Sequence, residues 1–146
     1  MERVNVMKIF LSYRFTGEDQ QELSKMLGMI LEILESAGHS VFCSFSLEDY
    51  FREQEWSVEE IYAYCLAEQE KCDIVLAIVK SEDRSRGMEV ELEHARTLNQ
   101  KCVLAIRKEL GLPRFREQAS YIFEYTNLND LCQQLDNVVR VRFARV

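Results

Sequence analysis

DIVLAIV, residues 73–79, is the stretch of the sequence that indicates the fold most directly. After its first residue it contains no polar side chain, and a strand without polar alternation is typical of a parallel sheet that is covered on both faces. A second run of the same kind, CVLAI, follows at residues 102–106. Two such strands predict a sheet whose middle is buried between layers of helices.

The segments on either side alternate between further short strands and amphipathic helices. Strands are predicted at Met7–Tyr13, His39–Phe45 and Tyr121–Tyr125. Helices are predicted at Gln20–Ala37, from the Ser57–Glu60 capping box to about Lys71, at Gly87–Asn99, and from Asn127 or Asn129 to about Asn137. The sequence therefore predicts one three-layer α/β domain over residues 1–146, flavodoxin-like or Rossmann-like, with a five-stranded parallel sheet.

The composition narrows the possible partners. The formal net charge of −7 is unfavourable for binding a nucleic-acid polymer, which depends on many Lys and Arg contacts to phosphates. A single nucleotide remains possible, because a helix N-terminus can hold one phosphate with backbone N–H groups. The five cysteines form no C-x-x-C pair, which favours reduced thiols in the cytoplasm over a zinc site. No apolar stretch approaches the ~20 residues that span a membrane, and no metal or dissociable cofactor is expected.

In a parallel sheet of this type a ligand lies beyond the carboxyl ends of the strands. That rule selects three connections, Ser12–Gly17, Phe45–Glu55 and Lys80–Glu91. The first offers hydroxyls, the guanidinium of Arg14 and, just before a helix, Gly17, a combination that suits a phosphate or a carboxylate. It could equally be a polar turn in which Glu18 and Asp19 only cap the helix. The second is predicted to be a surface loop with at most a short helical turn.

The third connection leads into the strongest catalytic candidate. Glu89, Glu91 and Glu93 alternate there, so on a helix each points about 200° away from the one before it. Glu91 adjoins the apolar stripe that includes Leu92 and Ala95, so it is the one expected near the sheet edge. A partly buried carboxylate beside a helix N-terminus can stay ionised and act as a nucleophile. The alternative is that all three are ordinary first-turn acids that favour the helix dipole.

Three motifs occur in order at the ends of the predicted strands. They are SYR followed by GED within residues 12–19, CDIVLA at 72–77, and the pattern S-x-G-x-x-x-E-L-x-x-A at Ser85, Gly87, Glu91, Leu92 and Ala95. This combination resembles the nucleoside 2-deoxyribosyltransferase superfamily, and its spacing is most similar to that of the 2′-deoxynucleoside 5′-monophosphate N-glycosidases. The resemblance covers about residues 8–108.

The resemblance implies cleavage of the N-glycosidic bond of a nucleotide or nucleoside, by hydrolysis or by transfer. Glu91 would attack the anomeric carbon, the base would leave, and water or a second base would resolve the glycosyl-enzyme. Tyr13 would join Glu91 in the catalytic set, beside the sugar and base. The phosphate and sugar would be held by Ser12, Arg14, Gly17, Ser85 and Gly87. The resemblance also implies a homodimer in which Arg114 or Arg116 completes the pocket of the neighbouring subunit.

One position departs from the family pattern. The family commonly has an aspartate on the second helix, about eight residues before the Cys72-Asp73 pair, which assists protonation of the leaving base. Cys65 occupies that position here. The acids that could reach the base instead are Glu59, Glu60 and Glu68, or Glu48 and Asp49 in the preceding connection.

A second resemblance is to the TIR domain. IFLSYR at residues 9–14, followed by Gly17-Glu18-Asp19, is similar to its first box. Enzymatic TIR domains hydrolyse the nicotinamide–ribose bond of NAD with a glutamate at the position matched by Glu91. The Trp-Cys pair that usually precedes this glutamate is Gly87-Met88 here, and no R-D-x-x-P-G box follows the second strand. A TIR-type NAD hydrolase is therefore the second hypothesis.

A third hypothesis is a non-catalytic nucleotide-binding or protein-interaction module. The acidic, tyrosine-rich segment Tyr50–Tyr64 would then be a partner surface, because aromatic residues are enriched at interfaces. Trp56 could serve there, or it could be a lid or a core anchor. Stacking of a base on Trp56 or Phe51 is a further possibility.

Overall fold

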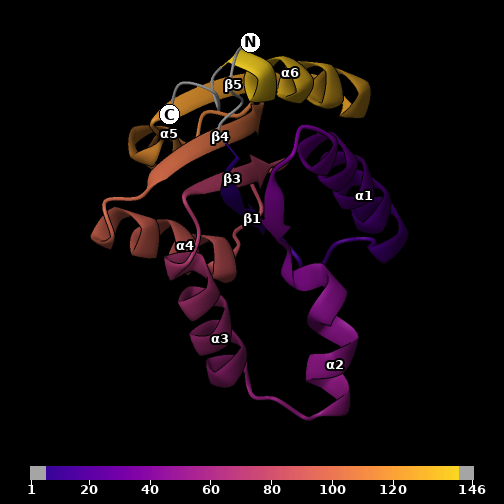
Figure 1. Cartoon of the computed structure of the whole chain (residues 1–146), viewed down its shortest axis with the longest axis vertical. Helices are drawn as coiled ribbons and strands as arrows, with labels where there is room; N and C mark the ends of the chain where they lie inside the picture. Colours follow the sequence, from indigo (N-terminus) through magenta and orange to yellow (C-terminus); the bar gives the residue numbers. More distant parts are fainter. Residues whose placement is uncertain (1–5, 142–146) are drawn as a thin grey trace.

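A parallel sheet forms the centre of the molecule, with helices on both of its faces (Figure 1). The computed structural model describes residues 6–141. The strands are β1 (Lys8–Tyr13), β2 (Ser40–Phe42), β3 (Ile74–Val79), β4 (Lys101–Arg107) and β5 (Tyr121–Tyr125). The helices are α1 (Gln20–Ser36), the 3₁₀ helix η1 (Ser44–Leu47), α2 (Glu48–Glu53), α3 (Val58–Glu70), α4 (Arg86–Thr97), α5 (Pro113–Gln118) and α6 (Leu128–Val141).

The strand order identifies which of the two predicted α/β arrangements is present. The order is β2-β1-β3-β4-β5, and every neighbouring pair is parallel. This is the flavodoxin-like order and not the Rossmann order. The order reverses between β1 and β3, where Ser12 pairs with Ala77 and Tyr13 with Ile78. A ligand is expected beyond the carboxyl ends of these two strands.

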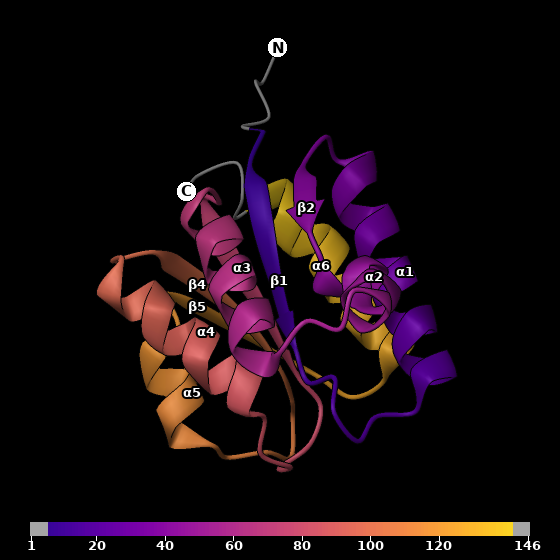
Figure 2. The ribbon, with the colours of Figure 1, turned by 90° about the horizontal axis from the view of Figure 1, so that it is seen from below.

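The two faces of the sheet carry different helices. Helices α1 and α6 cover one face, and α3 and α4 cover the other (Figure 2). Successive strand residues point to opposite faces, so Ile9 and Leu11 pack toward α1 and α6 while Phe10 packs toward α3 and α4. All six residues of β3 are buried, which confirms the prediction from its unbroken apolar run. The same alternation directs Ser12 toward α4.

The predicted boundaries are wrong in two places. The strand predicted to reach Phe45 ends at Phe42, and the chain turns into η1, where the hydroxyl of Ser46 donates to the carbonyl of Cys43 at 3.2 Å. Helix α2 follows in the connection predicted to be a surface loop with at most a short helical turn; its six residues are too few to show helical periodicity. Helix α6 continues past the predicted Asn137 to Val141 because the two valines before Val141 are buried.

Side-chain caps set where the helices begin. The predicted capping box is confirmed: Ser57 Oγ accepts from the backbone N–H of Glu60 at 3.1 Å, and the Glu60 carboxylate accepts from the N–H of Ser57 at 3.1 Å. Asp19 caps α1 by accepting from the N–H of Glu22 at 2.9 Å. Gly38 follows the end of α1 with φ of +94°, a left-handed conformation that glycine adopts without strain.

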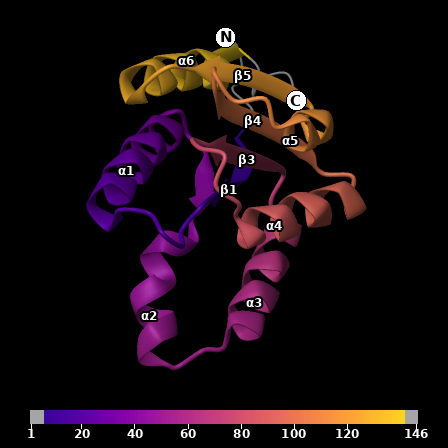
Figure 3. The ribbon, with the colours of Figure 1, turned by 180° about the vertical axis from the view of Figure 1, so that it is seen from behind.

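Helices α2 and α3 form an arm that extends from one edge of the molecule (Figures 1 and 3). An aromatic cluster holds the arm together; it consists of Phe10, Phe42, Tyr50, Phe51, Trp56 and Tyr64. The Trp56 ring lies 4.9 Å from that of Phe51 and 5.6 Å from that of Tyr64, between ring centroids. Phe42 and Phe10 continue the contacts into the sheet, at 5.4 Å from each other. Trp56 is therefore an anchor of the arm.

The remaining structural facts concern thiols, metals and membranes. All five cysteines are free, and four of them are buried. Within residues 6–141 no three His, Cys, Asp or Glu side chains gather in a way that could hold a metal ion. Over the same residues no helix is both long enough and apolar enough to cross a bilayer.

Candidate active site

A cavity of about 490 Å³ opens beyond the carboxyl end of β1. All three predicted connections contribute to its walls, and α3 supplies a fourth side. The lining side chains are Tyr13, Arg14, Phe15, Thr16, Ser44, Glu48, Val58, Ile61, Tyr62, Cys65, Arg84, Ser85, Arg86, Gly87 and Glu91. The sheet edge selected by the sequence is therefore hollow, as a ligand site requires.

Glu91 is fixed in this cavity by one hydrogen bond from the sheet. It lies in the second turn of α4, and Ser12 Oγ donates to Glu91 Oε1 at 2.7 Å. Ser12 is completely buried, so its hydroxyl cannot exchange this partner for water. The other carboxylate oxygen, Oε2, makes no hydrogen bond to any residue between 6 and 141. One oxygen of Glu91 is anchored and the second is available to a ligand.

The environment of Glu91 favours its neutral form. Burial raises the pKa of Glu91 to about 8, and the hydrogen bond from Ser12 lowers it in part. No cation contributes to this shift. A carboxylate with so strongly displaced a pKa, placed in a cavity, is typical of a functional site. Such a group becomes a strong nucleophile once it loses its proton in a poorly solvated position.

Tyr13 lines the cavity, but its hydroxyl is engaged with the chain. It lies 3.1 Å from the hydroxyl of Ser44. Burial raises the pKa of Tyr13 above its usual value, and the nearby Cys43 adds to the shift. Tyr13 is therefore a neutral phenol over the physiological range. It could orient a sugar or base by a hydrogen bond, but it cannot act as a general base there.

Three arginines line the mouth of the cavity in a chain whose net charge is −7. Arg14 is paired with Glu18 at 3.2 Å and also donates to the carbonyl of Arg84 at 3.3 Å. Arg84 forms a two-pronged pair with Glu89, at 2.7 and 3.1 Å. Arg86 is exposed and makes no hydrogen bond or ion pair with any of residues 6–141. Among the three, Arg86 is the cation with a free guanidinium for an anionic ligand.

The remaining predicted ligand-binding residues are Gly17, Ser85 and Gly87. Ser85 and Gly87 line the cavity, and Ser85 Oγ caps α4 by accepting from the N–H of Met88 at 3.3 Å. Gly17 lies outside the lining residues. It adopts φ of +83°, and a Cβ built there would come within 2.8 Å of Arg14 Nη2. The structure therefore gives Gly17 a local role in holding the turn around Arg14.

The wall supplied by α3 was not predicted to belong to the site. Val58, Ile61, Tyr62 and Cys65 are spaced i, i+3, i+4 and i+7, so they form one stripe along the helix. That spacing is present in the sequence and could have indicated an apolar helix face. Phe51 and Trp56, in contrast, pack in the aromatic cluster and are absent from the cavity walls.

A buried glutamine pair connects the backbone of Glu91 to the end of α3. Gln69 is completely buried, and its Nε2 donates to the carbonyl of Glu91 at 2.8 Å and to Gln100 Oε1 at 3.1 Å. Gln100 Nε2 donates in return to the carbonyls of Gln69 and Cys72 at 3.0 and 2.9 Å. Both the side chain and the main chain of Glu91 are thus held by buried polar groups.

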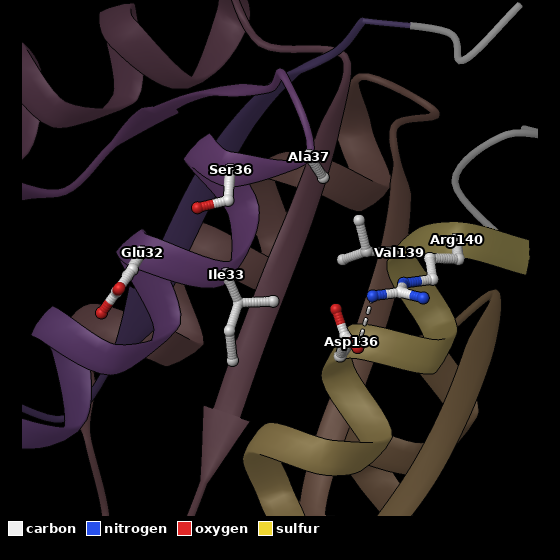
Figure 4. Close-up of a pocket in the computed structure, with 7 residues that line it drawn as sticks. All are labelled: Glu32, Ile33, Ser36, Ala37, Asp136, Val139 and Arg140. Atoms are coloured by element: carbon white, nitrogen blue, oxygen red, sulfur yellow. Dashed lines mark ion pairs between the residues drawn. The ribbon is translucent and has the colours of Figure 1, made fainter.

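A second hollow of about 490 Å³ lies between α1 and α6, on the opposite face of the sheet (Figure 4). Glu32 and Ile33 line it from α1, and Asp136, Val139 and Arg140 line it from α6. Asp136 and Arg140 pair with each other at 3.2 Å. No residue of the three sequence motifs lies in this hollow.

Comparison with known proteins identifies similar folds. No family model matches the sequence, and no curated protein matches it. The CMP N-glycosidase of Clostridium botulinum aligns over 89% of this chain and 98% of its own length, with a TM-score of 0.67 and 18% identity. A 2-deoxyribosyltransferase from Bacillus psychrosaccharolyticus aligns over 88% and 95%, with a TM-score of 0.62 and 21% identity. A response regulator receiver domain from Clostridium thermocellum reaches 0.54 at 17% identity, over 94% and 97%.

These identities are low, so the similarity concerns the fold. The receiver domain shows that the fold alone does not determine an activity. The two higher of these three TM-scores belong to an N-glycosidase and a 2-deoxyribosyltransferase. The comparisons therefore confirm the α/β fold that the resemblance to the nucleoside 2-deoxyribosyltransferase superfamily implies, and they concern the fold alone.

Proposed function

We propose that this protein cleaves the N-glycosidic bond of a nucleoside monophosphate, with Glu91 as the nucleophile and water as the acceptor of the sugar. The observation that supports this most is the environment of Glu91. One of its carboxylate oxygens is held by the buried Ser12 hydroxyl at 2.7 Å, and the other has no partner among the described residues. An anchored carboxylate in a cavity is what attack on an anomeric carbon requires.

The proposed reaction has two steps. In the first, a Glu91 oxygen bonds to C1′ as the bond from C1′ to the base nitrogen breaks, and the electron pair stays with the base. In the second, a water molecule attacks C1′ and releases Glu91. Transfer of the sugar to another base would follow the same course if that base occupied the place of the water. The apolar wall of Val58, Ile61 and Tyr62 is suited to cover the face of a base.

The charges at the cavity mouth favour a monophosphate over an uncharged nucleoside. Arg86 has no partner among residues 6–141 and stands at the N-terminus of α4, beside Ser85 and Gly87. A helix N-terminus and a free guanidinium both attract an anion. Arg14 and Arg84 already pair with Glu18 and Glu89. We therefore propose that these two arginines contribute to the shape and the electrostatic potential of the cavity mouth.

We also propose a cytoplasmic homodimer, following the family resemblance. Arg116 is an unsuitable donor to a neighbouring pocket, since it binds the carbonyl of Leu110 at 2.6 Å and Glu124 at 3.2 Å in its own chain. Arg114 is exposed and is the better candidate. Light scattering should then give twice the 17.2 kDa mass of the chain, and the mass of a single chain would contradict the dimer.

The test is release of free base, followed by chromatography, from nucleoside monophosphates, nucleosides and NAD. Glu91→Gln should lower the rate roughly 10³-fold or more, since it removes the attacking oxygen charge. Glu93→Gln is the matched control, because Glu93 lies two residues further along α4, exposed and paired with Arg96 at 3.0 Å. Equal rates in the wild type and Glu91→Gln would refute the role of Glu91.

The choice of substrates separates this proposal from the other two hypotheses. Release of nicotinamide from NAD, without release of base from monophosphates, would favour a TIR-type NAD hydrolase. Saturable binding of a nucleotide without any release of base would favour a non-catalytic binding module. An added free base that captures the sugar would indicate transferase activity.

A further inference from the structure

A second carboxylate lines the same cavity as Glu91 and has no role in the reaction described so far. Glu48 is the first residue of α2, and it reaches the cavity from the arm, whereas Glu91 reaches it from α4. We infer that Glu48 is the acid that protonates the leaving base and the base that later activates water, which rests on the proposed function. Enzymes that cleave glycosidic bonds commonly divide the work between two carboxyl groups in this way.

Glu48 differs from the other acidic residues of the arm in its exposure, its partners and its position at the cavity. Asp49 is more than four-fifths exposed and is paired with Arg52. The Glu60 carboxylate accepts a hydrogen bond in the capping box of α3, and Glu68 is paired with Lys71 at 3.0 Å. None of these three residues lines the cavity, and neither does the exposed Glu59. Glu48 is half-buried and is the only one of the five that lines it.

Glu48 and Glu91 line the same cavity as Cys65, and both carboxylates act on its thiol. Burial raises the pKa of the Cys65 thiol to about 12, and both Glu91 and Glu48 add to that rise. The same two carboxylates raise the pKa of Cys43. A sugar and its base could occupy the cavity that both carboxylates line.

Cys65 itself is unsuited to protonate a base. A thiol whose pKa is about 12 is too weak an acid to protonate a leaving group near neutral pH. Burial shifts the pKa of Glu48 upward, which keeps its proton to higher pH than an exposed glutamate would. Within its own helix, Arg52 lowers the pKa of Glu48 and Asp49 raises it. The charge of Glu48 in turn adds to the raised pKa values of Tyr13 on β1, Cys43 beside η1 and Cys65 on α3.

With Glu48 in this role, every proton transferred in the reaction has a donor and an acceptor. As the bond between C1′ and the base nitrogen breaks, the proton of the Glu48 carboxyl moves to the base, and Glu91 holds the sugar as an ester. The Glu48 carboxylate next takes a proton from the water that attacks C1′. Glu91 leaves as a carboxylate, and both groups return to their starting states. The net change is nucleotide plus water to free base plus sugar phosphate.

The position of α2 makes this role depend on the aromatic cluster. Phe51 is almost completely buried and lies three residues after Glu48, so its contacts with Trp56 and Tyr64 hold the helix against the cavity. The arm therefore places an acid in the same cavity as the nucleophile, although the position expected for an acid carries Cys65.

The test compares a leaving group that needs a proton with one that does not. The substrates are the nucleoside monophosphate cleaved by the wild type and the 4-nitrophenyl glycoside of ribose 5-phosphate, whose phenolate leaves unprotonated. Glu48→Gln should lower kcat/KM on the nucleotide roughly 10²-fold or more and leave kcat/KM on the aryl glycoside within about tenfold. The comparison uses kcat/KM because it reports departure of the leaving group and not the later attack of water, which both substrates share. Glu91→Gln should abolish both reactions. Asp49→Asn is the matched control and should affect neither, and Glu48→Asp should retain part of the nucleotide activity.

The pH dependence gives a second readout. The first step of the aryl reaction needs only ionised Glu91, so its kcat/KM should rise with pH and then stay constant. The nucleotide reaction also needs protonated Glu48, so its rate should fall again at high pH. Equal losses on both substrates in Glu48→Gln, or no loss on the nucleotide, would overturn the role of Glu48 alone. A wild type that cleaves neither substrate would overturn the proposed function as well.

Discussion

The hydroxyl of Ser12, on β1, donates to Oε1 of Glu91, on α4, at 2.7 Å across 79 positions of the sequence. This bond joins the first strand to the helix that follows the third strand, at the point where the strand order reverses. A hydrogen bond to a carboxylate stabilises the ionised form. Ser12 therefore opposes the burial that otherwise keeps Glu91 protonated.

Ser12→Ala should move the pH dependence of the reaction to higher pH. Loss of the hydrogen bond raises the pKa of Glu91 above its present value of about 8, by roughly one unit if the bond contributes ~1.4 kcal/mol. At pH 7 the rate should fall about tenfold from this effect. The measurement is kcat/KM between pH 5 and 10, with Ser24→Ala on the exposed side of α1 as the control. A lower rate with an unchanged pH profile would contradict the argument.

Glu91→Gln should stabilise the fold, and by more at high pH. In the unfolded chain Glu91 ionises near pH 4.5, whereas in the folded chain it keeps its proton to about pH 8. Between these values the folded state binds the extra proton, so the stability of the wild type falls as pH rises, by up to ~1.4 kcal/mol per pH unit. Glutamine carries no charge and escapes this loss.

The difference in Tm between Glu91→Gln and the wild type should therefore grow from pH 5 to pH 8. The exposed Glu93→Gln should show no such trend, because its carboxylate stays in water. All other titrating groups are shared by the compared proteins and cancel. A difference that stays constant with pH would mean that Glu91 ionises normally. This measurement needs no substrate and tests the site independently of its activity.

The sheet and its ligand edge were predictable because they depend on patterns within short segments. The apolar runs at 73–79 and 102–106 suffice for buried parallel strands, and parallel strands bring their following loops to one edge. The contact between Ser12 and Glu91 was not predictable, because it depends on the register of α4 over β1. Helix α2 was predictable only as a possible short helical turn, because Phe51 is its one buried residue and one residue defines no period.

The partners of the arginines also escaped prediction. Arg14 is predicted to bind an anion, and in the structure it also forms an unpredicted ion pair with Glu18, four residues further along the loop. Charge pairing of this kind is decided by side-chain geometry, which sequence spacing alone does not provide. Arg86 differs from the other two arginines of the cavity because it forms no ion pair within residues 6–141.

Arg86→Ala should weaken the binding of a monophosphate and leave an uncharged nucleoside unaffected. Loss of one guanidinium contact to phosphate should raise KM about tenfold, equivalent to ~1.4 kcal/mol, with little change in kcat. Arg96→Ala, at the other end of the same helix, is the matched control, since Arg96 is paired with Glu93 at 3.0 Å. The KM of the wild type should also rise with salt. Equal effects on nucleoside and nucleotide would exclude a phosphate at Arg86.

Two glycine substitutions should change stability in opposite directions. Gly17→Ala forces a side chain into φ of +83° and toward Arg14 Nη2, 2.8 Å away, so it should destabilise the fold by ~1–2 kcal/mol. Gly28 lies inside α1 with nothing within 4 Å of the added carbon, so Gly28→Ala should stabilise by about 0.5–1 kcal/mol. Urea denaturation at pH 7 measures both.

The variants Gly17→Ala and Gly28→Ala together also test whether Gly17 has a structural role or binds the ligand. If Gly17 only shapes the turn around Arg14, the loss of activity in Gly17→Ala should follow its loss of stability and recover on cooling. Combining it with Gly28→Ala should then restore part of both, because the two sites lie in different elements and their effects should add. Activity that stays low in a stabilised double variant would instead indicate that the backbone of Gly17 contacts the substrate directly.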